Sequence, residues 1–435
     1  MTPSSFAHRL AVRSALPRLS AGPRAPVNIG FLGPLSGPVQ SWGLPGLNGA
    51  RIWEDWLNAA GGLMIDGQRH PVCIHAFDCG YDPDHSMDGA RQMVQRHEVA
   101  LLMMLGGDTF TPVRDFLMRS RILTSTLLPS DLTPDTPWLI APSELHPIYC
   151  VTGIDWLARH RPELKTAAIC SQTDALGLPS LATYRAAFKA AKIGVTREVQ
   201  YPPGQTDPAP IVDAMLEEAP DILCWSTSYT PMVHAMTEYA HARDFSGQII
   251  SCTLDNYPAL VARTSEEFME GTLFQFPDFD DPLLREKAFF FNQPEIFFQE
   301  YNRRFPGTWS AVSWEYVATL EIWRAAVEKA GSLAPASVLA AMKQLGQVSH
   351  AFGPAEWWGD EMFGISNALV GDWPVVTVQA GKARITEFGS IPAWLDRHGA
   401  LLRREMSDLG QLWEQRLARG GWAFAGGRGE ATSGT

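Results

Sequence analysis

A glycine-rich stretch, FLGPLSGPVQSWGLPGLNGA at residues 31–50, lies between a short apolar run and a helical pattern. Such a loop can bind phosphate at a helix N-terminus if its backbone N–H groups point at the anion. Here Pro34 and Pro38 remove two donors, and no P-loop lysine follows. The candidate ribose-binding acids Glu54 and Asp55 fall inside the helix. The glycines are spaced G-x-x-G-x-x-x-G instead of G-x-G-x-x-G, at Gly30, Gly33 and Gly37. The pattern disfavours a dinucleotide site and favours the lip of another ligand cleft.

A second cluster of reactive residue types, HAFDCGYDPDH, occupies residues 75–85. His75 and Asp78 are three residues apart on a predicted strand, so their side chains point to opposite faces. The remaining acids and histidine fall on a predicted helix cap and helix start, where solvated roles are favoured over a metal site. His234 and His241 are seven apart on a later helix, too far for an i, i+4 zinc pair. We therefore expect no metal and no cofactor.

The cysteines form no C-x-x-C pair and no regular framework, and the chain has no G-x-S-x-G motif. They are expected to be buried, unpaired thiols, which mildly favours a reducing compartment. None stands in an evident Cys–His arrangement, so we predict that the protein is not an enzyme. The six positions are Cys73, Cys79, Cys150, Cys170, Cys224 and Cys252.

Composition excludes two further classes of function. The 435 residues carry a net charge of −12 without a basic stripe, which argues against a nucleic-acid partner. No run approaches the ~20 apolar residues of a membrane helix, so direct membrane insertion is not expected. Residues 1–26 are rich in Arg and Ser and lack a continuous apolar core. An unstructured leader and a signal with a misplaced start would both look like this, so periplasmic and cytoplasmic locations both stay open.

Strand-like and helical runs alternate along the chain. The first series begins at "VNIGFLG" and "LNGARIWEDWLNAAGG", and a second begins near His146 with "IYCVTGIDWLARHR" and "TAAICSQ". Regular βα alternation predicts parallel sheets with helices on both faces. Two such series predict two doubly wound lobes of the α/β class. Later elements include a helix "SWEYVATLEIWRAAVEKA" ended by Gly331 and a hairpin "WPVVTVQAGKARITEF" with its turn at Gly381-Lys382.

Several motifs follow one another in an order typical of one family. After the first strand come Gly33, Ser36, Gly37, Gly43, Gly49-Ala50, Asn58 and Gly61-Gly62-Leu63. "FDCGYDPDHSMDGARQMV" follows, with Asp82-Pro83 as helix cap and first helical residue, then "CWSTSYTPMVHAMTEYAHARDF", "HAFGPAEWW" and the final hairpin. This order resembles the type I periplasmic binding proteins, in the leucine/isoleucine/valine-binding branch. The resemblance runs from about residue 27 to 387.

The resemblance implies two lobes joined by a three-strand hinge, closing on a ligand that touches both. Lobe 1 would comprise residues 27–146 and 273–346, and lobe 2 residues 147–272 and 347–387. A helical extension and a disordered tail would follow at 388–435. The implied function is capture of a small molecule for an ABC-type importer, with its permease as partner if the protein is exported. The alternative is a cytosolic ligand sensor of the same fold that controls a regulator, as the amide-sensing relatives do. An enzyme built in the interlobe cleft ranks third.

The resemblance also implies which residues contact the ligand. In lobe 1 they are Trp42 at the loop tip and, where the family uses carboxylate-binding hydroxyls, Gly107, Asp108, Thr109, Leu127 and Leu128. In lobe 2 and the crossover they are Leu176, Tyr229, Asp255 with its neighbour Asn256, Phe276 and Phe279. Trp42 is alternatively a surface-packing residue, and Asp108 alternatively an N-cap for the helix "TPVRDFLMRS".

Departures from the family pattern bear on the ligand. A free α-amino acid needs converging donors for its carboxylate, and a buried carboxylate without them costs several kcal/mol. Here Gly107, Leu127 and Leu128 stand where hydroxyl groups would be needed. We therefore expect a more apolar or neutral small molecule, such as an aromatic, an amide or a urea-like compound, instead of leucine.

Overall fold

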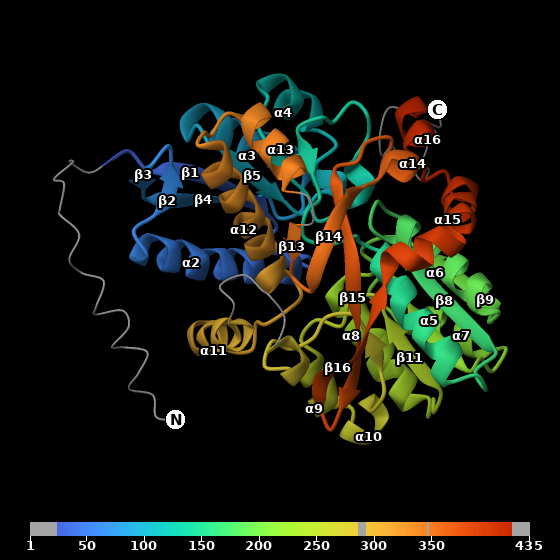
Figure 1. Cartoon of the computed structure of the whole chain (residues 1–435). Coiled ribbons are helices and arrows are strands. Elements are labelled where there is room, and N and C mark those ends of the chain that lie inside the picture. Colours follow the sequence, from blue (N-terminus) through green and yellow to red (C-terminus); the bar gives the residue numbers. More distant parts are fainter. Residues whose placement is uncertain (1–23, 286–292, 346–347, 420–435) are drawn as a thin grey trace, which may run out of the picture.

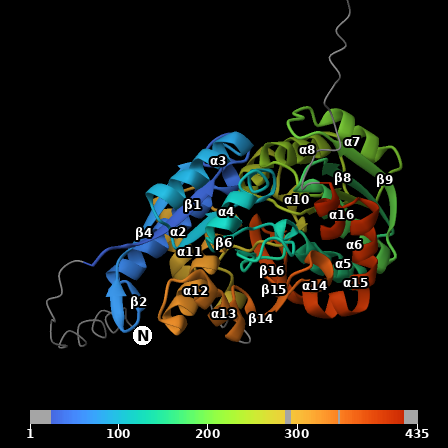
Figure 2. The ribbon, with the colours of Figure 1, turned by 90° about the horizontal axis from the view of Figure 1, so that it is seen from above.

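The computed structural model describes residues 24–285, 293–345 and 348–419, which form two lobes side by side (Figures 1 and 2). The N-terminal segment builds most of the first lobe, and the segment that follows builds most of the second. Orange and red segments from late in the chain run between the lobes (Figure 1). This arrangement confirms the predicted α/β class.

The first lobe is built on a five-stranded sheet in which every pairing is parallel, in the order β4-β1-β5-β6-β7. Buried apolar residues dominate its central strands, as expected for a sheet covered on both faces. A small hairpin, β2 (Leu63–Ile65) with β3 (Gln68–His70), lies beside it. The sheet strands are β1 (Val27–Gly33), β4 (Val72–Asp78), β5 (Leu101–Met104), β6 (Thr124–Ser125) and β7 (Leu139–Ile140).

Helices from two separate stretches of the chain cover this sheet. The N-terminal set confirms the predicted Asp82-Pro83 start, because the Asp82 carboxylate accepts hydrogen bonds from the backbone N–H groups of Asp84 and His85. α12 ends at Gly331, as predicted, with the glycine in the left-handed conformation. The helices are α2 (Leu44–Ala59), α3 (Pro83–Arg91), α4 (Arg114–Ser120), α11 (Pro294–Arg304), α12 (Val312–Ala330) and α13 (Pro335–Gln344).

The second lobe repeats the same plan. Its parallel strands lie in the order β9-β8-β10-β11-β12, and the antiparallel strands β15 and β16 extend the sheet beyond β12. The strands are β8 (Thr166–Gln172), β9 (Gly194–Tyr201), β10 (Ile222–Trp225), β11 (Gln248–Ser251), β12 (Leu273–Phe274), β15 (Ala368–Gln379) and β16 (Lys382–Ser390). The helices are α5 (Val151–His160), α6 (Gly177–Ala191), α7 (Ala209–Leu216), α8 (Thr230–Ala242), α9 (Tyr257–Arg263) and α10 (Glu266–Met269).

Three stretches of chain pass between the lobes. The first follows β7, where Ala141 pairs with Ala368 at the start of β15. The second follows β12. The third runs through β13 (Val348–His350), β14 (Gly353–Trp358), α14 (Asp360–Phe363) and β15. These passages agree with the predicted three-strand hinge. The lobe boundaries at 146/147 and 272/273 stay predictions, and the boundary at 346/347 lies outside the described residues.

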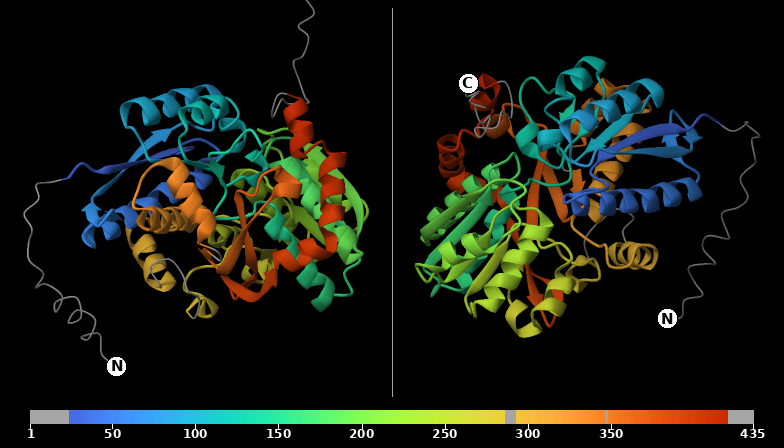
Figure 3. Two further views of the ribbon diagram at one scale, coloured as in Figure 1. Left: turned by 45° about the horizontal axis from the view of Figure 1, so that its top comes forward. Right: turned by 180° about the vertical axis from the view of Figure 1, so that it is seen from behind.

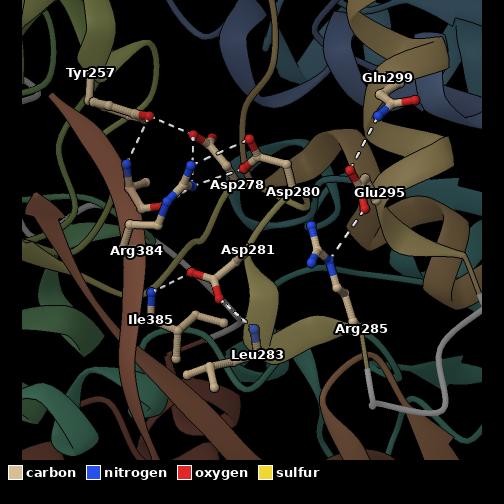
Figure 4. Close-up of polar contacts among 11 residues, drawn as sticks. Tyr257, Asp278, Asp280, Asp281, Leu283, Arg285, Glu295, Gln299, Arg384 and Ile385 are labelled. Atoms are coloured by element: carbon tan, nitrogen blue, oxygen red, sulfur yellow. Dashed lines mark hydrogen bonds and ion pairs between the residues drawn. The ribbon is translucent and has the colours of Figure 1, made fainter. Parts of the chain in front are cut away.

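The second passage is anchored to α9 and β16 by a row of acidic side chains (Figure 4). Asp278 accepts a 2.6 Å hydrogen bond from the Tyr257 hydroxyl, and Asp280 accepts one from the Arg384 guanidinium at 2.9 Å. Asp281 accepts from the backbone N–H of Ile385 at 2.8 Å. The segment that carries Phe276 is therefore held firmly to the second lobe.

The C-terminal hairpin and helices depart slightly from expectation. The turn falls at Ala380-Gly381, one residue early, and β16 continues to Ser390 instead of ending near 387. The predicted amphipathic helices are present as α15 (Ile391–Asp408) and α16 (Trp413–Ala418), and α15 packs on α6 (Figure 3). Residues 1–23 of the expected leader and 420–435 of the expected tail lie outside the described residues. Within the described part of the chain, no helix is both long and apolar enough to cross a membrane.

Candidate functional site

The carboxyl ends of the parallel strands in both lobes point into one interlobe cleft. In doubly wound sheets ligands bind at this edge, because the loops after the strands are free to carry side chains that fit them. The loop after β1 leads to a short turn, η1 (Gln40–Trp42), and the loops after β6, β8 and β11 approach it from the other strands. Residues far apart in the sequence thus meet at one place.

A cavity of about 30 Å³ lies at this meeting point. Five of the predicted contact residues line it: Trp42, Leu127, Leu128, Leu176 and Phe276. The other lining residues are Leu105, Glu144, His146, Tyr149, Thr227, Thr253, Ala311, Val312 and Glu315. The cavity is far smaller than the ~300–1,000 Å³ typical of small-molecule pockets, so an organic ligand needs the lobes to separate or the walls to repack.

A second cavity, of about 160 Å³, adjoins the first through Phe276 and Ala311. Its walls include three of the predicted contact residues, Asp255, Asn256 and Phe276, and the buried acid Asp278. The two cavities together run along the cleft between the lobes.

Direct contacts already join the lobes across the cleft. The indole N–H of Trp42 donates a 2.7 Å hydrogen bond to the carboxylate of Asp255. The hydroxyl groups of Ser41 and Thr230 lie 2.8 Å apart. Trp42 also meets the ring of Tyr229 edge-on at 6.0 Å between centroids. Trp42 is therefore buried between the lobes, which disagrees with the alternative of a tryptophan that packs on a lobe surface.

Asp255 is a buried acid in a partly compensating environment. Burial raises its pKa to about 6, against the lowering effect of hydrogen bonds from Trp42, Thr230 and the backbone of Ala311. The carboxylate of Asp255 accepts hydrogen bonds from Trp42 in lobe 1 and from Thr230 in its own lobe. The charge of Asp255 therefore affects the contact between the lobes.

Of the predicted contact residues after β5, Gly107 and Thr109 form hydrogen bonds within lobe 1. Gly107 donates its backbone N–H to Asp131 at 2.9 Å, and a Cβ placed on it would lie 3.0 Å from Leu128. Thr109 donates its hydroxyl to the Gly106 carbonyl, so it is engaged in its own turn. The alternative prediction, that Asp108 is the N-cap of the next helix, is wrong. That helix, α4, begins at Arg114, and its N-cap is Val113, without a side-chain cap.

Asp108 instead lies in an acidic group near the cleft mouth. Its pKa is raised to about 7 by burial first, and then by the neighbouring carboxylates of Asp174 and Asp131. Burial, and then the carboxylates of Asp108 and Asp174, raise the pKa of Tyr81, whose ring contacts Tyr229 edge-on at 6.3 Å.

Two further predicted contact residues, Tyr229 and Phe279, line neither cavity. Tyr229 caps the start of α8 and touches Trp42 and Tyr81, as described above, without lining either cavity. Phe279 packs on Trp309 and Trp314, at 5.2 and 5.3 Å between ring centroids. The side chain of Phe279 therefore supports the wall behind the cleft.

Sequence reasoning missed the polar groups of the first cavity, above all Glu144 and Glu315. Glu315 lies on the buried stripe of α12, between Val312 and Thr319. A charged residue on an apolar helical stripe is a signal that could have found it. Glu144 lies in the passage after β7, where no periodicity applies, and only the folded chain brings it to Glu315.

The expectation of no Cys–His arrangement is also wrong. The Sγ of Cys252 lies 3.9 Å from the Nε2 of His146 and 3.1 Å from the hydroxyl of Thr227. The thiol is fully buried and is not part of the cavity wall. All six cysteines are free, and five of them are buried, with Cys73 partly exposed. Within the described ranges, no group of three or more His, Cys, Asp and Glu side chains is placed to hold a metal ion.

Comparison with known proteins agrees with this geometry. A family model described as periplasmic binding protein matches residues 26–383. Among solved structures, a leucine-binding protein LivK from Thermotoga maritima is 15% identical with a TM-score of 0.66, covering 84% of this chain and 99% of its own.

Two further similar structures are ABC transporter solute-binding proteins from R. palustris. One, in complex with benzoate, is 14% identical with a TM-score of 0.67, covering 84% of this chain and 96% of its own. The other, in complex with 4-hydroxybenzoate, is 16% identical with a TM-score of 0.68, covering 84% of this chain and 97% of its own. No curated protein sequence matches this chain. At these identities the solved structures show the fold, which is that of type I solute-binding proteins, and the family match covers most of the chain. The chain therefore belongs to the periplasmic binding protein family.

Proposed function

We propose that this protein captures a small organic molecule in its interlobe cleft and delivers it to an ABC-type importer. The observation that carries the proposal is the first cavity, whose walls come from loops of both lobes. A ligand held by both halves stabilises the closed form, because the open form lacks half of its contacts. The two R. palustris proteins, which bind benzoates by their titles, are examples of small organic ligands in this fold.

A free branched-chain amino acid fits this cavity poorly, so the leucine-binding branch is not the best functional assignment. Leu127 and Leu128 occupy the wall where a zwitterion would need hydroxyl donors. Among the described residues that line the two cavities, none is Lys or Arg. An apolar body between Trp42, Leu176 and Phe276 matches the wall better.

Binding without turnover is the second part of the proposal. The thiol of Cys252, which contacts His146, is not part of the cavity wall, so it does not face the ligand. The cytosolic sensor alternative gains no support from the comparisons. If the protein is exported, its mature N-terminus should be recovered from a periplasmic extract.

The test is recovery of a co-purified ligand by native mass spectrometry, followed by thermal-shift and small-angle scattering measurements with that compound. We expect the compound to return unchanged after incubation, to raise Tm and to reduce the radius of gyration. Stabilisation by leucine, isoleucine and valine alone would contradict the ligand class. Conversion of the bound compound to a product would contradict the role of a carrier.

A further inference from the structure

We infer that the ligand of this cleft carries a positively charged nitrogen, as a primary amine or amidine on a small apolar body, and is bound by Glu144 and Glu315. This inference rests on the proposed function and names the class of solute. It differs from the neutral ligand that the sequence favoured, because the paired acids emerge only in the folded chain.

The two acids carry the carboxyl groups of the first cavity's wall, which also contains the polar side chains of His146, Thr227 and Thr253. Glu144 comes from the passage after β7 and Glu315 from α12, and both line the first cavity. They are 5% and 1% exposed. Burial is the largest cause of the raised pKa of each acid, and the interaction with the Glu315 carboxyl group raises the pKa of Glu144 further.

Glu315 has bonding capacity left for a ligand. Within the described part of the chain, Oε1 of Glu315 has no hydrogen-bond donor. A buried acceptor without a donor is destabilising, more so if it is charged, so an N–H group that enters the cavity and donates to it relieves that cost. A carboxylate entering the same place would add a third acid.

The rest of the wall also favours a cation. The rings of Trp42, Tyr149 and Phe276 face the cavity, and aromatic faces attract ammonium and guanidinium-like groups. The titratable groups around the acid pair are Cys252 and Asp255 after β11, His146 and Tyr149 on the first passage, and Tyr316 on α12. None of them is a permanent cation that would neutralise the pair.

Cation binding should therefore release a proton. Burial raises the pKa of Glu315 to about 8 and that of Glu144 well above its usual value, so the empty pair is largely protonated at pH 7. An ammonium group replaces the proton as the partner of the carboxylates. Affinity for an amine should then rise with pH between about 6 and 8, provided that the amine itself stays charged.

The experiment compares matched ligands on the full-length protein. Benzylamine, benzamide and benzoate share one ring, and isobutylamine, isobutyramide and isobutyrate share one aliphatic body. We expect only the amines to raise Tm and bind in calorimetry, with a binding enthalpy that differs between phosphate and Tris buffers at pH 7 because a proton is released. Binding of the carboxylates or amides in place of the amines would overturn this inference and leave the carrier function standing. A wide solute screen without any Tm shift would instead contradict the carrier function, and this inference with it.

Variants separate a ligand-binding role from a structural one. Glu315→Gln keeps the side-chain shape and should weaken amine binding by about tenfold or more, with loss of the buffer-dependent enthalpy. Glu144→Gln should act in the same direction. The matched control, Glu328→Gln, lies on the same helix α12 in a surface ion pair with Arg324 and should change neither quantity. Unchanged amine affinity and proton release in both folded cleft variants would overturn the assignment.

Discussion

At the scale of single residues, Trp42 combines two functions that the sequence could not separate. Its ring lines the first cavity, and its N–H group bridges to Asp255 on the opposite lobe. The glycine-rich loop, which was predicted to form the lip of a ligand cleft, contains the short turn η1, and this turn carries the indole to the first cavity. The same residue thus lines the cavity and joins the two lobes.

Replacing Trp42 by phenylalanine removes the bridging N–H and keeps an aromatic wall. Loss of a hydrogen bond to a charged group costs about 1.5–3 kcal/mol, so the Kd of the bound solute should rise roughly ten- to hundredfold. Isothermal calorimetry on Trp42→Phe checks this. Trp53→Phe is the matched control, since Trp53 donates to the carboxylate of Glu321 within lobe 1 at 2.6 Å. It should lower Tm without changing the Kd, and equal losses in both variants would contradict the bridging role.

At the scale of elements, the packing of α2 on α12 positions the acid Glu315. The two helices approach so closely that a Cβ on Gly49 would lie 1.9 Å from the Ser313 carbonyl oxygen, and one on Gly46 would lie 2.2 Å from the Tyr316 ring. Neither glycine is needed for backbone freedom, because both lie inside a helix. Their small size instead determines how closely α12 packs on α2 and on the loop after β1.

Gly49→Ala should therefore destabilise the protein, because the helices must move apart to admit a methyl group. Overpacking of this kind costs about 1–3 kcal/mol, measured as the free energy of unfolding in urea. The control is Gly399→Ala in α15, where a Cβ meets nothing within 4 Å. It should stabilise the protein by up to about 1 kcal/mol through helix propensity. A neutral Gly49→Ala would show that the α2–α12 contact is loose.

The elements also show where sequence reasoning succeeds. Caps, stops and turns are local, so the Asp82 cap, the Gly331 stop and the final hairpin follow from neighbouring residues alone. The meeting of Glu144 with Glu315, and of His146 with Cys252, depends on how a passage between lobes is routed. No periodicity encodes that route. The parallel sheets of the two lobes, by contrast, follow from βα alternation, and the ligand cleft between them was implied by the family resemblance.

At the scale of the whole molecule, buried acids with raised pKa values gather along the cleft. The pKa is about 7 for Asp108, about 6 for Asp255 and Asp278, and about 8 for Glu315. Burial is the largest cause in each case, and separation of the lobes would expose these groups to water. Ionisation therefore favours both lobe opening and unfolding, whereas a bound cation opposes them.

This distribution predicts that the empty protein loses stability as pH rises. The acids have ordinary values near 4 when unfolded, so between about pH 4.5 and 8 the folded state holds more protons and the free energy of unfolding falls with pH. Burial lowers the pKa of His350 to about 4, so this histidine makes the free energy of unfolding rise with pH, but only below its ordinary value of 6.5. We expect Tm to be higher at pH 5.5 than at pH 8.

Two measurements separate unfolding from lobe opening in that pH range. Calorimetry at pH 5.5, 6.5, 7.3 and 8 gives Tm, and small-angle scattering at the same values gives the radius of gyration of the empty protein; these pH values bracket the acids' pKa range. The radius should increase towards pH 8 while the protein is still folded, because ionised acids repel one another across the closed cleft. Glu315→Gln should flatten both trends, and Glu328→Gln should leave them as in the parent chain. A Tm that is constant or rises from pH 5.5 to 8 would mean that the acids are already ionised in the folded protein, each with a partner in the cleft.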